Sequence, residues 1–198
     1  MFTGIIESIG RIGAVKPSGQ SAVLTIDAGG LDMSEIAVGD SIACNGVCLT
    51  VVSLVARGFT VDVSQETLAV TAGFGAGDAI NLEKSLRLSD RLGGHLVSGH
   101  VDGIGTVTAV KPVDGNREIN VRFPAELARY FARKGSVAVN GVSLTINALD
   151  GDNFSINLIP HTLAVTNLGD LKKDSLVNLE VDLVARYVER MLDGDNVR

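Results

Sequence analysis

The amino-acid sequence contains one long stretch twice, at a constant spacing of 95 residues. Residues 2–71 align without a gap over residues 97–166, and about 22 of the 70 pairs are identical. The phrase SIACNGVCLTV (41–51) returns as SVAVNGVSLTI (136–146). A solenoid stacks many units of roughly 20–45 residues, so a long repeat present in only two copies indicates duplicated domains.

Each copy carries short strand patterns. AVLTID (22–27), CLTVVSLV (48–55) and FTVDVS (59–64) are rich in β-branched residues, alternate in part, and are separated by turn residues. Strands that recur about every ten residues with tight turns are typical of an antiparallel sandwich or barrel. A length of about 90 residues suits a small closed barrel, which leaves no exposed sheet edge. The sequence therefore predicts two small all-β domains.

Three segments have helical character instead. PAELARYFARKG (124–135) starts with Pro and ends before Gly, and GGLDMSEIAVGD (29–40) is its shorter and less regular counterpart. DLVARYVERMLDG (182–194) places its apolar residues on one face of a helix. That apolar stripe either packs on its own domain or against copies of itself, and the pattern leaves both open.

Composition argues against several functional classes. The net charge is −6 and no run of Lys or Arg exceeds two residues, so the footprint of a nucleic-acid-binding protein is missing. No uninterrupted apolar stretch approaches the roughly 20 residues of a membrane span. The first residues, MFTGIIESIG, lack the basic region and cleavable apolar core of a signal peptide, so we expect none.

The two cysteines, Cys44 and Cys48, lie four residues apart. On a single strand they would be about 13 Å apart at roughly 3.3 Å per residue, too far for a disulfide. We therefore expect reduced thiols, a cytoplasmic location, and a core position for Cys44. Two Cys and three scattered His show no metal-ligand spacing, so no metal site is expected.

Five motifs occur in order along the chain: MFTGIIE at its start, NGVCLTV, GGHLVSGHVDG (93–103), NGVSLTI and LIPHTLAVTNLG (158–169). Together they resemble the riboflavin synthase α-chain family over essentially the whole chain. The resemblance implies an all-β fold of two tandem six-stranded Greek-key β-barrels, produced by the internal duplication, plus a C-terminal α-helix. The domains implied are an N-terminal lumazine-binding barrel (1–85), a linker (86–96), a C-terminal lumazine-binding barrel (97–182) and a trimerisation helix (183–198).

The resemblance also implies an activity, the last step of riboflavin biosynthesis. Members of the family are transferases that convert two molecules of 6,7-dimethyl-8-ribityllumazine into riboflavin and 5-amino-6-(D-ribitylamino)uracil by moving a four-carbon unit. They need no cofactor and no metal, and they form homotrimers, with lumazine synthase as a candidate partner. Each active site lies between the N-terminal barrel of one subunit and the C-terminal barrel of its neighbour. The duplication then has a reason, because the reaction consumes two identical molecules.

Substrate-binding residues follow from the same motifs. A flat bicycle with amide-like edges and a polyol tail is bound by backbone groups and hydroxyls inside an apolar slot. The resemblance assigns to a first cradle Gly4, Ile5, Ile6, Cys48, Leu49, Thr50, Asp62, Val63, Ser64, Gln65, Glu66 and Thr67. It assigns to a second cradle Gly99, His100, Val101, Lys134, Ser143, Leu144, Thr145, Ile159, Pro160, His161, Thr162, Leu163 and Ala164. Phe2 is expected to fold back over the site.

The chemistry requires a proton acceptor whose pKa lies near ambient pH, which points first to histidine. His100 replaces Ile5 of the first copy, so it is expected to serve one cradle only. Cys48 has Ser as its counterpart and is a candidate nucleophile or polar contact. Ser41 and Asp182 complete the catalytic candidates, and Asp182 also suits the N-cap of the C-terminal helix.

Two other functional classes remain as alternatives. Antenna proteins of the same fold bind lumazine or flavin without turnover, but they tend to lose the identity of the second cradle. Here SGHVDG, NGVSLTI and PHTL are all intact, which favours the enzyme. A flavin-handling redox domain is less well supported, since no dinucleotide-binding Gly motif follows a strand. The sequence leaves open which barrel binds the donor and which group is the base.

Overall fold

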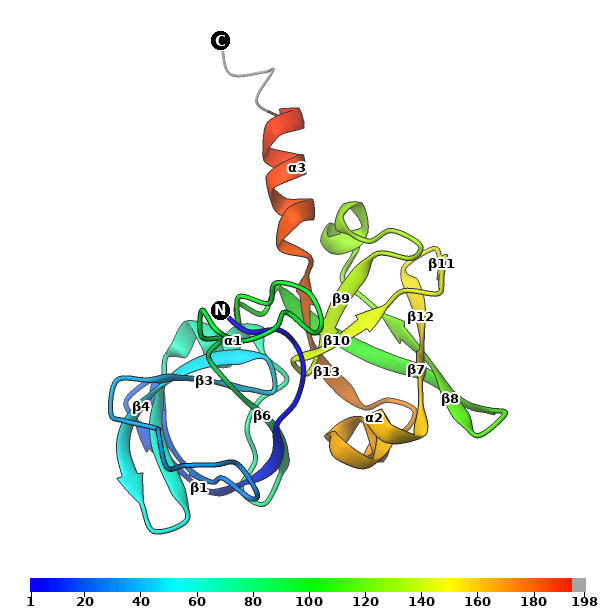
Figure 1. The fold of residues 1–198 in the computed structure, drawn as a ribbon. Helices are drawn as coiled ribbons and strands as arrows, with labels where there is room; N and C mark the ends of the chain where they lie inside the picture. Colours follow the sequence, from blue (N-terminus) through cyan, green and yellow to red (C-terminus); the bar gives the residue numbers. More distant parts are fainter. Residues whose placement is uncertain (194–198) are drawn as a thin grey trace.

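Two β-barrels lie side by side, and a C-terminal helix projects away from them (Figure 1). The computed structural model describes residues 1–193. The first barrel occupies the N-terminal half of the chain and the second the C-terminal half, so the duplication seen in the sequence is also the architecture.

The first barrel is closed, with the strand order β1-β2-β5-β4-β3-β6 and antiparallel pairing throughout. Alternate residues of β2 are buried, as a strand with one face on a core requires. Closure pairs every strand on both sides and leaves no edge exposed. The strands are β1 (Ser8–Ser18), β2 (Ser21–Asp27), β3 (Ser41–Cys44), β4 (Val47–Val55), β5 (Gly58–Val63) and β6 (Ala79–Lys84).

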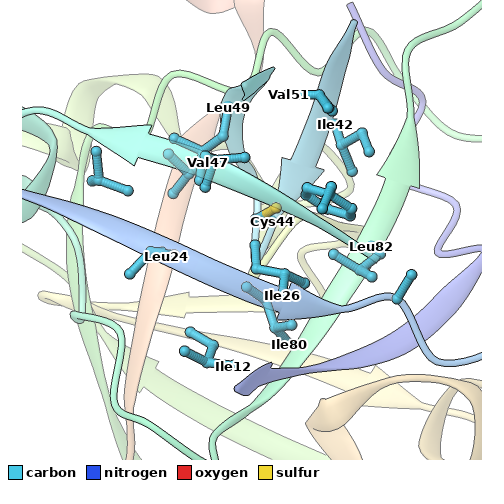
Figure 2. Packing of buried hydrophobic residues seen from close by; sticks show 14 of the residues in the cluster. Ile12, Leu24, Ile26, Ile42, Cys44, Val47, Leu49, Val51, Ile80 and Leu82 are labelled. Atoms are coloured by element: carbon cyan, nitrogen blue, oxygen red, sulfur yellow. The ribbon is translucent and has the colours of Figure 1, made fainter. Parts of the chain in front are cut away.

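Aliphatic side chains from all six strands fill the first barrel. Figure 2 shows the thiol of Cys44 among them, in the same cluster as Ile26, Ile80 and Leu82. Cys44 is fully buried, which confirms the predicted core position. Burial raises the pKa of its thiol far above the ordinary value, because a thiolate has no solvation there.

The second barrel keeps the same strand order with one strand broken. Its seven strands pair in the order β10-β9-β13-β7-β8-β12-β11. The first and last of these are the two halves of the counterpart of β4, separated at Ile146 and Asn147. The strands are β7 (Gly103–Val113), β8 (Asn116–Arg122), β9 (Ser136–Val139), β10 (Val142–Thr145), β11 (Ala148–Asp150), β12 (Asn153–Leu158) and β13 (Leu176–Val181). The predicted pair of six-stranded barrels is therefore present.

The remaining helices are short. They are α1 (Gln65–Val70), the 3₁₀ helix η1 (Ala125–Tyr130), α2 (Pro160–Val165), the 3₁₀ helix η2 (Asn167–Asp170) and the longer α3 (Leu183–Asp193). The Ser64 side chain accepts a hydrogen bond from the Thr67 backbone N–H and caps α1, and Pro160 begins α2. These two helices lie at equivalent places in the two barrels, directly after β5 and β12.

Two helix predictions were wrong. The segment 124–135 forms only the six-residue η1, because Phe131 turns into the core with an extended backbone and contacts two other phenylalanine rings. The segment 29–40 contains no helix. There, the side chains of Asp27 and Asp32 accept hydrogen bonds from backbone N–H groups two residues on, which stabilises turns at the expense of helix.

The apolar stripe of α3 is largely uncovered in the single chain. Val184, Tyr187 and Met191 are 61%, 65% and 77% exposed. The opposite side of the helix is tied to η1, since Glu189 accepts a hydrogen bond from the Tyr130 hydroxyl and pairs with Arg129. The sequence left open whether the stripe packs on its own domain or against copies of itself. In the single chain, little of the stripe packs on its own barrel.

Candidate functional site

The two barrels meet through contacts that occur twice, in opposite senses. The Asn178 side chain donates to the backbone carbonyl of Asn45 at 2.9 Å, and the Asn81 side chain donates to that of Asn140 at 3.0 Å. The repeat relates Asn45 to Asn140 and Asn81 to Asn178. The interface is thus the intramolecular equivalent of a two-fold symmetric dimer contact.

Two tight hairpins form the centre of this interface. Asn45 and Gly46 connect β3 to β4, with φ values of +48° and +79°. Asn140 and Gly141 connect β9 to β10, with φ values of +47° and +80°. Asn-Gly is the strongest sequence signal for such a turn. Cys44 and Cys48 therefore lie on two paired strands, which corrects their placement on a single strand; both are free thiols.

Each barrel is covered by a segment that precedes the first strand of the other. The backbone N–H of Cys48 donates to the carbonyl of Gly99 at 2.8 Å, and that of Ser143 donates to the carbonyl of Gly4 at 2.8 Å. Val101 packs against the first core and Ile6 against the second. The expected grouping of Gly4–Ile6 with Cys48 and of Gly99–Val101 with Ser143 was wrong, because the two segments are exchanged.

The exchange begins at a short antiparallel bridge between Phe2 and Val97. Each donates its backbone N–H to the carbonyl of the other, at 2.7 and 3.1 Å. The Phe2 ring is fully buried and packs with Val97, Ala43, Ala138 and the partly buried Cys48. Phe2 thus lies beneath the candidate site at the junction of the barrels, where its ring supports Cys48.

Two buried carboxylates hold the exchanged segments in place. Glu83 accepts hydrogen bonds from the N–H and hydroxyl of Thr3 and from the N–H of Gly4, at 2.6, 2.7 and 3.0 Å. Glu180 accepts four such bonds from residues 98–100, at 2.6 to 3.1 Å. Burial raises the pKa of both carboxyl groups, while the hydrogen bonds oppose that rise.

Cys48 and His100 line one cavity of about 240 Å³ at the first barrel. The cavity combines the start of β4, helix α1 and the exchanged segment 99–101. Cys48 and Thr50 point to the outer face of β4, and the strand register places Ser41 opposite Thr50 on that face. The residues that line this cavity are Val47, Cys48, Glu66, Thr67, Val70, Thr71, Gly99, His100 and Val101.

The corresponding position of the second barrel carries a hydroxyl–imidazole pair. Nδ1 of His95 lies 2.7 Å from the Ser143 hydroxyl oxygen, and Nε2 is buried without a hydrogen-bond partner among the described residues. Burial lowers the pKa of His95, opposed in part by the charge of Asp182. His95 was not singled out from the sequence, since the repeat offset maps it to a position before Met1.

The four catalytic candidates do not share one pocket within a single chain. Cys48 and His100 are together, but Ser41 lines a separate cavity of about 300 Å³ beside Lys84 and Arg87. Asp182 lines a cavity of about 450 Å³ beneath α3. Its carboxylate also accepts a hydrogen bond from the Val184 N–H at 3.0 Å, as an N-cap does.

The other substrate-binding candidates do not all lie on one surface. Asp62–Thr67 and Ile159–Ala164 form equivalent corners where a strand runs into a short helix. Leu49 and Val63 are buried in the first core, so only their backbone groups face outward. Lys134 is exposed and has a φ of +69°.

Among residues 1–193 no group of three or more His, Cys, Asp or Glu side chains is arranged to hold a metal ion. In that same range no helix is long and apolar enough to cross a membrane.

Comparison with known proteins identifies both halves. The lumazine binding domain family matches residues 3–85 and again residues 98–182. The chain is 47% identical over 197 residues to the riboflavin synthase of Photobacterium leiognathi, covering 98% of this chain and 90% of that protein. It is 44% identical over 198 residues to the riboflavin synthase of Brucella abortus, covering 96% and 98%.

Among solved structures, LumP is similar in fold. The LumP complex with riboflavin superposes with a TM-score of 0.85 at 25% identity, covering 91% of this chain and 99% of that one. The LumP complex with 6,7-dimethyl-8-(1'-D-ribityl) lumazine gives a TM-score of 0.83 at 24% identity, with the same coverage. The curated relatives are thus considerably closer in sequence than LumP.

Proposed function

The chain belongs to the riboflavin synthase family, and we propose that it converts two molecules of 6,7-dimethyl-8-ribityllumazine into riboflavin and 5-amino-6-(D-ribitylamino)uracil. The reaction class is transferase, since a four-carbon unit passes from one lumazine to the other. The similarity to riboflavin synthases covers nearly the whole chain at 44–47% identity and supports this activity over an antenna role. The identity to LumP is only 25%, and that comparison supports the fold.

The observation that carries the proposal is that each barrel pairs one nucleophile-type side chain with one imidazole. Cys48 and His100 share the cavity of the first barrel, and Ser143 is bonded to His95 at the second. One lumazine must lose a proton from its acidic methyl group while the other is attacked, so two proton-transfer sites are needed. Equivalent frameworks with different side chains suit two identical molecules that react differently.

His95 fits the role of proton acceptor on chemical grounds. Because burial lowers its pKa, its imidazole is neutral at ambient pH, and a neutral ring nitrogen can accept a proton from a bound group or from Ser143. Its ring is oriented by the hydrogen bond between Nδ1 and the Ser143 hydroxyl, and its backbone N–H donates to the carbonyl of Thr3 at 3.2 Å. Nε2 is buried without a hydrogen-bond partner among the described residues, so a substrate would reach it only if the covering groups move.

The complete active site is proposed to lie between the first barrel of one subunit and the second barrel of its neighbour in a homotrimer. The Cys48 cavity, at about 240 Å³, is smaller than the roughly 300–1,000 Å³ of typical ligand sites and needs another surface to close it. The exposed apolar stripe of α3 supplies a surface for assembly. Both cysteines are free thiols, which is consistent with the proposed cytoplasmic location. Lumazine synthase is proposed as a candidate partner.

Turnover tests the proposal directly. Purified protein, dialysed against a chelator, is incubated with 6,7-dimethyl-8-ribityllumazine while riboflavin is followed by its own absorbance. We expect one riboflavin for every two lumazines consumed. Tight binding of a fluorescent ligand without turnover would instead identify an antenna protein, and a strict metal requirement would contradict the proposed chemistry.

A further inference from the structure

The segment that carries His100 is fastened to strand β13 at both of its ends. At one end Glu180 accepts the hydrogen bonds of residues 98–100. At the other end the backbone N–H of Asp102 donates to the Leu179 carbonyl at 2.8 Å, and the Asp102 carboxylate accepts from the Val181 N–H at 2.7 Å. The position of His100 in the Cys48 cavity therefore depends on both carboxylates.

The first copy has the same fastening with a local counter-charge. Glu7 is the counterpart of Asp102; its N–H donates to the Leu82 carbonyl at 2.9 Å and its carboxylate accepts from the Lys84 N–H at 2.7 Å. Lys84 thus contacts Glu7 twice, because its side-chain ammonium group also pairs with the Glu7 carboxylate at 3.4 Å. Glu7 is 37% exposed, so water also stabilises its charge.

The second copy draws its counter-charge from a different element. The counterpart of Lys84 is Val181, which has no charge, and the Asp102 side chain is only 5% exposed. The cation paired with Asp102 is Arg186, on α3. This helix has no equivalent in the first copy, where residues 85–96 follow β6 instead. A local pair is thus replaced by a pair that joins two elements, a buried carboxylate and a partly exposed guanidinium.

We propose that Arg186 is a positioning residue, which holds the His100 segment through Asp102 and thereby couples the docking of α3 to the Cys48 cavity. A buried carboxylate that loses its cation keeps an uncompensated charge, and the structure relieves it by moving the carboxylate toward water. That movement releases the Val181 N–H and displaces the segment that lies on Cys48. The assembly helix and the chemistry of the first barrel are then linked within one chain.

The catalytic part of this inference rests on the proposed function, so the test combines turnover with a structural measurement. Arg186→Gln removes the cation at similar length. We expect kcat/KM for lumazine to fall about tenfold, with a loss in kcat because the candidate reacting group His100 is displaced with its segment. Hydrogen–deuterium exchange of the backbone amides of residues 98–102 should become at least several-fold faster.

Two matched variants on the same helix serve as controls. Arg190→Gln removes an exposed guanidinium for which no hydrogen bond or ion pair occurs among the described residues, and should leave exchange and turnover unchanged. Glu189→Gln loosens the contact of α3 with η1, away from the His100 segment. Because the Arg186–Asp102 pair is retained, exchange of residues 98–102 should rise much less than in Arg186→Gln.

Rescue separates positioning from general destabilisation. Arg186→Lys should recover most of the turnover, since it restores a cation. The double variant Asp102→Asn/Arg186→Gln should be less impaired than Arg186→Gln alone, because no unpaired charge is then buried. Unchanged exchange in Arg186→Gln, or an equal effect of Glu189→Gln, would overturn the proposal. If the parent protein lacks turnover, the proposed function fails while the exchange data still decide whether Arg186 holds the segment.

Discussion

Gly46 and Gly141 face each other across the contact between the two barrels. A Cβ atom added to either would lie 2.7 Å from the backbone nitrogen of the other. Both residues also have positive φ values, +79° and +80°, which L side chains rarely adopt. Each hairpin tip therefore needs glycine for two separate reasons, its own backbone conformation and the closeness of its counterpart.

Replacement of either glycine should weaken the protein by similar amounts. Gly46→Ala and Gly141→Ala should each lower the free energy of unfolding by about 1–3 kcal/mol more than a positive φ alone would, because backbone atoms must shift apart. Gly115→Ala is the matched control, since Gly115 has a φ of +82° and nothing within 4 Å of the added atom. Urea unfolding measures the three values; equal losses would show that close approach is unimportant.

A fragment of residues 1–96 should fold but should not remain a monomer. It contains all six strands of the first barrel, yet it lacks the segment 99–101 that covers Cys48 and exposes Asn45 and Asn81. A second copy of the fragment offers both missing parts, because residues 4–6 are the counterparts of 99–101. Sedimentation should therefore give a dimer that binds riboflavin with little turnover. An unfolded fragment would count against independent barrels.

Exchange of the two nucleophile-type residues tests their division of labour. Cys48→Ser should lower turnover at least about tenfold, or 1.4 kcal/mol in the barrier, while lumazine still binds. A thiol loses its proton near pH 8.5 and a hydroxyl does not at ordinary pH. Ser143→Cys should change turnover less, since a thiol can still donate to the His95 imidazole. Full activity in Cys48→Ser would reduce Cys48 to a packing role.

His95 makes stability depend on pH in a defined direction. Its pKa is lowered by burial, whereas an unfolded histidine titrates near 6.5. Below that pH the unfolded chain binds a proton that folded His95 resists, so the free energy of unfolding falls as the pH decreases below about 6.5. His95→Asn should reduce the difference in stability between pH 7.5 and 5.5, and the exposed His161→Asn should not. Equal pH dependence in both variants would refute this role.

Truncation after Asp182 should lower the oligomeric state and the activity together. The deletion removes the exposed apolar stripe, including Tyr187 and Met191, and it takes away the Arg186 partner of Asp102. Light scattering after gel filtration measures the assembly and riboflavin formation measures the activity. A fully active truncated monomer would refute both the trimer and a site shared between subunits.

The strands could be predicted because their pattern is local. Residues such as Leu24 and Ile26 alternate with half-buried neighbours, and the repeat gives the same strand order to both halves. The Asn45–Gly46 hairpin could also have been predicted from its dipeptide. The end of η1 could not be predicted, since Phe131 leaves the helical pattern to pack against Phe123, just before η1, and against Phe154, on β12.

The exchange of segments could not be predicted from the repeat. Gly4 and Gly99 align in the two copies, and an alignment of copies says which positions correspond but not which copy each one contacts. Both arrangements satisfy the same local pattern, and the difference lies in the bridge between Phe2 and Val97. His95 escaped notice for a related reason, because an unrepeated residue has no counterpart to compare.

The burial of Cys44 has a practical consequence for following this protein in solution. The chain has only two cysteines, and the buried one has a thiol whose raised pKa keeps it from reacting. We therefore expect an alkylating reagent to titrate one group in the native protein, the partly buried Cys48, which lines the cavity that it shares with His100. Cys44 becomes available to the reagent only when the first barrel opens. Labelling of Cys48 would therefore report whether the cavity is occupied, and the rate at which Cys44 is labelled would report how often the first barrel opens.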